Sequence, residues 1–112
     1  MNSGPAKILP TWSGKSKFKY HGSVSKGTEI EYGTARSKQS VSDVQYRDLL
    51  RHFSKKEVPI GASRDNPPPS SLGAWLKAHV TQTAIASYVG PILGREGFAK
   101  KAGAHGELIT FS

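Results

Sequence analysis

The sequence contains no cysteine among its 112 residues, which excludes a disulfide framework, a thiolate zinc site and a cysteine nucleophile. Nothing in the composition therefore indicates secretion, and a reducing cytoplasm is the expected compartment. The sequence also lacks any apolar run near the roughly 20 residues of a membrane-spanning helix, and its start, MNSGPAKILP, lacks the apolar segment of a signal peptide. We expect a soluble protein with no membrane partner that stays in the cytoplasm.

Common catalytic and cofactor motifs are absent as well. The four histidines show neither a His-Glu-x-x-His motif nor an i, i+4 pair: His21, His52, His79 and His105. The segment GKS at 14–16 ends like a phosphate-binding loop, but Leu9 stands where such a loop needs glycine and no helical pattern follows. With no cluster of carboxylates and no Gly-x-Ser-x-Gly elbow, we expect no metal, no cofactor and no enzymatic activity.

Acidic residues are few relative to basic ones. Eight Asp and Glu stand against sixteen Lys and Arg, which gives a formal net charge of +8. The excess is uneven, because residues 1–40 hold seven bases and two acids while residues 41–112 hold nine and six. A small basic chain of this kind attracts polyanions, so we expect a nucleic-acid partner above all.

Two segments near the N-terminus alternate strictly between apolar and charged residues, KFKY at 17–20 and EIEY at 29–32. This period is typical of half-buried strands and predicts a β-hairpin within a basic extension over 1–36. Pairing would place the lysines of the first strand beside the glutamates of the second, so cross-strand ion pairing and phosphate binding stay open for them. Lys15 and Lys26 have no nearby acid and are freer to bind a ligand.

The period of the sequence changes after a polar linker, TARSKQS at 34–40. Ser42 and Gln45 have the form of a capping box and predict a helix over about 43–55. The segment EVPI at 57–60 suits a brief edge strand, because its proline cannot donate to a central ladder. The proline-rich segment ASRDNPPPSS at 62–71 predicts a stiff surface loop.

The C-terminal third predicts two more helices and a hairpin. A stripe of apolar residues predicts a helix over 72–80 that Ser70 or Ser71 can cap. A further helix is expected from a cap at Thr81 to Gly97, which is placed as the residue that ends it. The segments FAKK and ELITF around a glycine-rich tip predict a terminal β-hairpin.

This order of elements resembles the winged helix-turn-helix family over residues 42–111. The segment SYVGPILGREGFAKK is especially similar to the family's usual passage from the third helix into the first strand of the wing. The resemblance implies an α+β fold in which a domain at 42–112 has three helices and a C-terminal β-hairpin wing, preceded by the N-terminal β-hairpin. It also implies DNA binding.

The third predicted helix has one apolar side and one side of small residues. The apolar side is expected to face the core: Ile85, Val89 and Ile92. The opposite side is expected to face outward: Thr83, Ser87, Gly90 and Gly94. Specific readers of the major groove usually project Arg, Lys, Asn or Gln toward the bases. Few side chains able to do so flank the small side: Gln82, Tyr88 and Arg95.

Pro91 should kink or split this helix, because it cannot donate a hydrogen bond to the carbonyl of Ser87. Base-specific reading by a straight helix is therefore not expected. Two hypotheses stay open for the small side. It lets a phosphate strand approach closely, with Thr83, Ser87 and the helix N-terminus as donors, and it equally lets another helix pack closely as a protein-docking or dimer surface.

The main functional hypothesis is a small basic protein that binds double-stranded DNA through its backbone and acts as a regulator or accessory factor. In the wing, whose nearest acid is Glu107, the resemblance implies contact with phosphates. The candidate DNA-binding residues are Lys15, Lys26, Lys77, Gln82, Thr83, Ser87, Tyr88, Arg95, Lys100, Lys101 and His105. The alternative is an interaction or inhibitor module that docks on a nucleic-acid enzyme through the small side of the third helix. An RNA-binding protein, the third hypothesis, would need Trp12, Phe18 or Tyr20 to be exposed.

Overall fold

The computed structural model describes residues 6–62 and 67–112, and ten elements follow one another along these two ranges. Four strands come first: β1 (Lys7–Pro10), β2 (Lys17–Ser23), β3 (Gly27–Tyr32) and β4 (Ser37–Val41). Then come α1 (Asp43–Phe53), β5 (Glu57–Pro59), α2 (Leu72–His79), α3 (Ala86–Arg95), β6 (Ala99–Ala102) and β7 (Leu108–Phe111). The proline-rich loop expected at 62–71 falls in part on 63–66, which lie outside the described residues.

The first four strands form one antiparallel sheet in the order β1-β2-β3-β4. Tyr20 of β2 lies opposite Ile30 of β3, and Lys19 lies opposite Glu31, which confirms the strand pairing predicted from the alternating pattern. Tyr20 and Ile30 are fully buried, whereas Lys19 is exposed. Since successive side chains point to opposite faces, this sheet has one face on the core and one charged face on solvent.

The remaining strands form a second antiparallel sheet in the order β5-β7-β6. Lys101 of β6 lies opposite the buried Ile109 of β7, while Lys100 lies opposite Thr110. The two neighbouring lysines therefore point to opposite faces of this sheet, and only Lys101 is on the face that covers the core.

The helix boundaries follow from local capping. At the start of α1, the Ser42 N–H donates to Gln45 Oε1 at 2.9 Å and the Gln45 N–H donates to Ser42 Oγ at 3.1 Å, so the predicted capping box is confirmed. At the start of α2, Ser71 Oγ accepts a hydrogen bond from the Ala74 N–H at 3.0 Å. Of the two expected caps, Ser71 is therefore the one that caps this helix. Both interactions satisfy donors that the first turn of a helix leaves free.

Helix α3 is shorter than expected and is not split. It begins at Ala86 instead of near Thr81, and it continues through Pro91. It ends as predicted, because Gly97 has a φ of 86° and the Phe98 N–H donates to the Leu93 carbonyl at 2.9 Å. That bond from beyond a left-handed glycine is the usual way to satisfy the last carbonyls of a helix.

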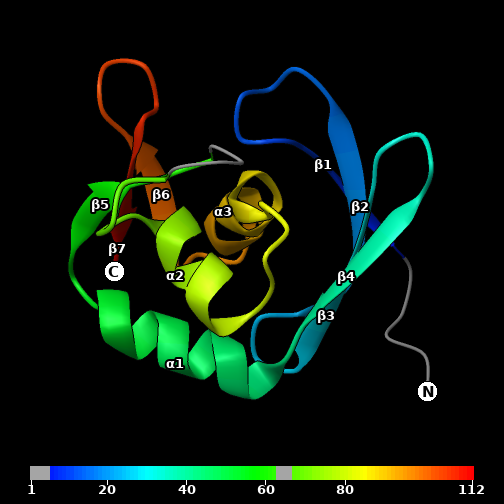
Figure 1. The fold of residues 1–112 in the computed structure, drawn as a ribbon, viewed down its shortest axis with the longest axis horizontal. Coiled ribbons are helices and arrows are strands. Elements are labelled where there is room, and N and C mark those ends of the chain that lie inside the picture. The colour runs from blue at the N-terminus through cyan, green and yellow to red at the C-terminus, as the bar shows by residue number, and fades with distance from the viewer. Residues whose placement is uncertain (1–5, 63–66) are drawn as a thin grey trace.

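Helix α3 lies between the two sheets. Figure 1 shows it nearly end-on at the centre, with β5, β6 and β7 on one side, β1 and β2 on the other, α1 below and α2 in front. Residues of α3 contact both β1 and β6. One hydrophobic core joins both sheets to the helices and includes Phe18, Leu49, Leu76, Ile92 and Ile109.

The predicted winged helix-turn-helix fold preceded by a β-hairpin is therefore wrong. The protein is a small α+β fold with two antiparallel sheets, in which the strands dominate. Residues 7–10 and 37–41, expected as extension and linker, are strands that widen the hairpin to four strands. The wider sheet reaches α3 and covers it, so this helix is not presented outward as a winged-helix domain requires.

Candidate nucleic-acid interface

Trp12, in the connection from β1 to β2, ties three parts of the fold together. Its backbone N–H donates to the Ser87 carbonyl of α3 at 2.9 Å, and its indole N–H donates to the Gly106 carbonyl in the β6–β7 turn at 2.6 Å. Its own carbonyl accepts a hydrogen bond from the Lys101 ammonium group. We call this set of contacts, made by Trp12 with Ser87, Lys101 and Gly106, the Trp12 junction.

Pro91 makes the first of these bonds available. In a regular helix the residue at position 91 would donate its N–H to the carbonyl of Ser87, but proline has no N–H. The Ser87 carbonyl is thus left without that helical donor, and the Trp12 N–H takes the place. The proline that we expected to kink the helix serves here to attach a loop to it.

The small side of α3 is covered by Trp12 at its centre. Gly90 is buried, and a Cβ atom there would lie 2.5 Å from Trp12 Cε3 and 2.8 Å from Cζ3. Only glycine lets the indole pack this closely against the helix. Gly94, one turn later, is exposed, and a Cβ atom there would meet only the Ala99 carbonyl oxygen at 3.8 Å. At Gly90 the small side therefore serves packing within the chain.

Beside the Trp12 junction an open groove of about 310 Å³ runs between β1, α3 and β6. We call it the Trp12 groove; its apolar walls come mainly from Leu9, Pro10, Trp12 and Pro91, and Gly94 also lines it. Its two charged lining residues are both basic, Arg95 and Lys101. The Lys101 ammonium lies 5.1 Å from the centre of the Trp12 ring, a distance at which a cation and an aromatic face attract each other.

The acid next to Arg95 is bound within the fold. Glu96 accepts hydrogen bonds from the Tyr20 hydroxyl at 2.8 Å and from the Val24 N–H at 2.9 Å, which fixes the end of α3 to β2. Burial raises the pKa of the Tyr20 hydroxyl, the hydrogen bond to Glu96 raises it further, and Arg95 opposes the shift. Tyr20 therefore stays a donor, and both carboxylate oxygens of Glu96 have partners within the fold.

The acid of the β6–β7 turn is also engaged locally. The His105 N–H donates to Glu107 Oε1 at 2.9 Å. Hydrogen bonds from the backbone of Glu107 itself and of His105 hold the pKa of this carboxyl below its usual value. His105 is exposed at the tip, one residue before the carbonyl that receives the Trp12 indole.

The structure brings together only part of the predicted site. Arg95 and Lys101 line the Trp12 groove, Lys15 is exposed in the loop that carries Trp12, and His105 is in the turn that binds it. Lys100 points to the other face of β6.

The other predicted residues do not line this groove. Lys26 is exposed in the β2–β3 turn, and Thr83 is exposed before α3. Gln82 donates to the Lys77 carbonyl at 3.0 Å and so closes the end of α2. Tyr88 stacks on Tyr32 with ring centres 4.6 Å apart. Ser87 contributes its carbonyl, through the Trp12 junction, to the fold.

Residues that sequence reasoning left out form most of the groove. The apolar walls were not expected as a site, and the sequence leaves Trp12 open between core and base stacking. The exposed fractions of Trp12, Phe18 and Tyr20 are 8%, 3% and 0%, so the condition set for the RNA-binding hypothesis is not met. The only local signal was a tryptophan next to a proline-containing strand, together with a Gly-Pro pair inside a helix.

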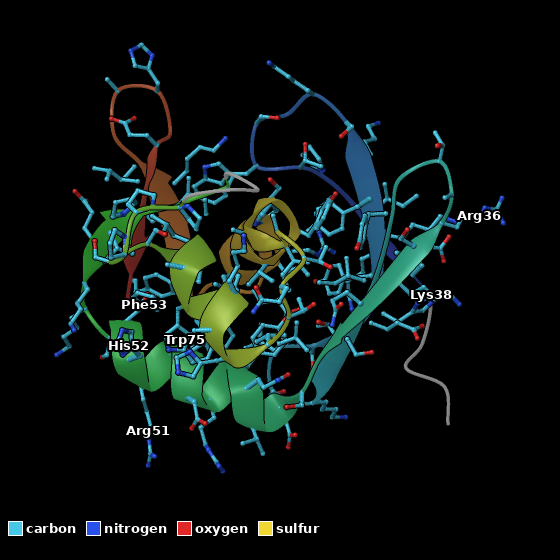
Figure 2. All side chains as sticks on the ribbon, viewed as in Figure 1. Arg36, Lys38, Arg51, His52, Phe53 and Trp75 are labelled. Carbon is cyan, nitrogen blue, oxygen red and sulfur yellow. The ribbon has the colours of Figure 1, made fainter. Side chains whose placement is uncertain are left out.

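A second aromatic group lies between α1 and α2. Trp75 is half-buried, and its ring stacks on that of His79 with centres 4.3 Å apart, while the ring of His52 lies 6.4 Å away. Figure 2 shows His52 and Trp75 side by side on these helices. Among the residues that the structure describes, no three His, Asp or Glu side chains are grouped as a metal site would require.

Comparisons of the chain with protein-family models, with curated proteins and with solved structures give no match. Within 6–62 and 67–112, no helix is long and apolar enough to cross a membrane.

Proposed function

We propose that the protein binds double-stranded DNA through its phosphate backbone and acts as an accessory or regulatory factor. The contact surface is the one around the Trp12 junction, with Arg95, Lys101 and Lys15 as the phosphate-binding side chains. The observation that carries the proposal is the Trp12 groove, whose charged lining residues, Arg95 and Lys101, are both basic while Glu96 is bound elsewhere. Both of these side chains are of the kind that binds phosphate oxygens.

The covered state of α3 favours backbone contact over base reading. Gly90 lies against the Trp12 ring, and the Ser87 carbonyl accepts a hydrogen bond from the Trp12 N–H. Tyr88 packs against Phe18 and Tyr32. A helix held in this way cannot lie along the floor of a major groove. Binding through phosphates alone would depend strongly on salt and little on base sequence.

The test is a salt series for a labelled DNA duplex with the native protein and two single variants. Arg95→Ala removes a cation from the proposed surface. Arg51→Ala removes the same charge from α1, where Figure 2 shows Arg51 pointing away from the rest of the molecule. Native binding should fall steeply with salt, and Arg95→Ala should lower the log–log slope by about 0.9, the value for one phosphate contact on duplex DNA.

The matched control decides between a local site and general attraction. Arg51→Ala should keep the native slope, because its charge lies outside the proposed surface. An equal decrease of the log–log slope in the two variants would show that only net charge matters and would contradict the proposed site. A duplex affinity that does not change with salt would contradict phosphate binding altogether.

A further inference from the structure

The Trp12 groove has an apolar surface that a phosphate alone would not contact. A phosphate needs donors and positive charge, which Arg95 and Lys101 provide at the groove. The surface between them is mainly apolar, from Leu9, Pro10 and Pro91 together with the edge of the Trp12 ring. Apolar walls next to a few charged groups are typical of sites that bind a ligand with a flat apolar body and an anionic end.

The size of the groove limits the ligand. Its volume of about 310 Å³ is at the lower end of the range for small-molecule pockets, which starts near 300 Å³. One aromatic heterocycle fits such a space. The glycine at position 94 keeps the groove open on the helix side, since no side chain extends there from α3.

The cations favour a ligand with phosphates. The Lys101 ammonium group donates one hydrogen bond to the Trp12 carbonyl. An ammonium group has three N–H donors, so this bond uses only one of them. Arg95 is the last residue of α3, and the end of this helix is held by the hydrogen bonds that Glu96 accepts from Tyr20 of β2 and from Val24. Two basic side chains therefore line one mainly apolar surface, as a base with adjacent phosphates requires.

We propose that the Trp12 groove binds one unpaired nucleobase of a single-stranded nucleic acid, with Arg95 and Lys101 on the adjacent phosphates. This inference rests on the proposed function, because the same cations bind the backbone in both. A base in a duplex must be unpaired and unstacked before it can enter, at a cost that a single strand does not bear. The groove should thus favour single-stranded over duplex segments.

Gly94 allows the groove to be filled without disturbing the core. It is exposed and has no left-handed backbone conformation, and a methyl group added there would meet only the Ala99 oxygen, at 3.8 Å. Gly94→Leu would place a branched side chain at the groove, and leucine favours helix more than glycine does. Gly94→Ala is the matched control, because it brings the helical preference with only one methyl group.

The experiment measures the affinity of the full chain for a short oligothymidylate, an abasic strand of equal length and a duplex, at one salt concentration. The native protein should bind the oligothymidylate about tenfold more tightly than the abasic strand, because a base in the groove would remove apolar surface from water. Gly94→Leu should bring that ratio close to one, and Gly94→Ala should keep most of the ratio.

The other possible results test the base site and the duplex proposal separately. Equal affinity of the native protein for the two single strands, or a ratio that Gly94→Leu does not reduce, would overturn the base site even if the duplex binds as proposed. Base-dependent binding that Gly94→Leu abolishes, without any duplex binding, would support the groove and refute the duplex proposal. Absence of binding to all three probes would refute both.

Discussion

Replacing Gly90 by alanine tests the central contact of the fold, the packing of Trp12 on α3. Two effects oppose each other. Alanine favours the interior of a helix over glycine by about 1 kcal/mol, which alone would raise the free energy of unfolding. The new methyl group, however, would lie 2.5 Å from Trp12 Cε3 and 3.0 Å from Ile60 Cδ1.

The steric effect should win, because the indole cannot move away without losing its bonds. Its ring N–H is bound to the Gly106 carbonyl and its backbone N–H to the Ser87 carbonyl. Overpacking of a rigid contact costs about 1–3 kcal/mol. We expect Gly90→Ala to lower the free energy of unfolding by about 1–2 kcal/mol, after the helical preference is taken into account.

Gly94→Ala, in the same helix, should have the opposite sign. Its methyl group meets only one atom at 3.8 Å, so the helical preference should raise the free energy of unfolding by up to about 1 kcal/mol. Urea unfolding followed by circular dichroism measures both variants. If Gly90→Ala proved as stable as Gly94→Ala, Trp12 would not cover α3, and the small side of the helix would be free for another occupant.

Three further predictions concern the sheet, the lysine pair and alkaline pH. Deleting residues 1–36 should abolish cooperative thermal unfolding, because it removes buried side chains of the shared core; a cooperative transition would show that the helices fold without the first sheet. Lys101→Ala should lower the free energy of unfolding by about 1 kcal/mol through its lost hydrogen bond, and Lys100→Ala should not; equal effects in urea would contradict the opposite orientations. Burial raises the pKa of Tyr20 and of Tyr46 above the ordinary 10.0, so the neutral hydroxyls favour the fold below pH 10 and this stability is lost as pH rises beyond it. Melting temperatures from pH 8 upward should fall above about pH 10, and less in Tyr46→Phe than in the native protein.

Local signals were sufficient for several elements. The capping box at Ser42 identified the start of α1, and the alternating residues of β2 and β3 predicted which side chains face each other. The glycine at position 97 predicted the end of α3, and its left-handed conformation confirms that prediction. Each of these features depends on residues close in the chain or on one simple period, so the sequence displays it directly.

The outer strands gave no comparable signal. In β4 only Val41 is buried, and Gln39, not an apolar residue, lies opposite Ile30. In β1 the exposed residue Ile8 is apolar, which inverts the expected alternation. These are edge strands that contribute hydrogen bonds more than core side chains, and periodicity cannot detect such a contribution. For that reason residues 7–10 and 37–41 were not predicted as strands.

The candidate site depended on contacts between distant parts of the chain. Nothing near Gly90 in the sequence indicates that the indole of Trp12, far earlier in the chain, fills its empty side, so the small side was expected to face outward. The excess of basic residues supports the hypothesis of a polyanionic partner. It does not show which cations share a surface. Lys100 and Lys101 illustrate this, since neighbours in a strand must point to opposite faces.

Pro91 affects both the packing of α3 and the groove beside it. Because it frees the Ser87 carbonyl, the loop with Trp12 can attach to α3 through its backbone, and the indole then covers Gly90. The same attachment places Pro10 and Pro91 on the walls of one groove, with Lys101 bound to the Trp12 carbonyl. Covering the middle of the helix and forming the Trp12 groove are thus two consequences of one contact. The middle of α3 is thus covered by Trp12, and beside the end of the helix lies a mainly apolar groove lined by two cations.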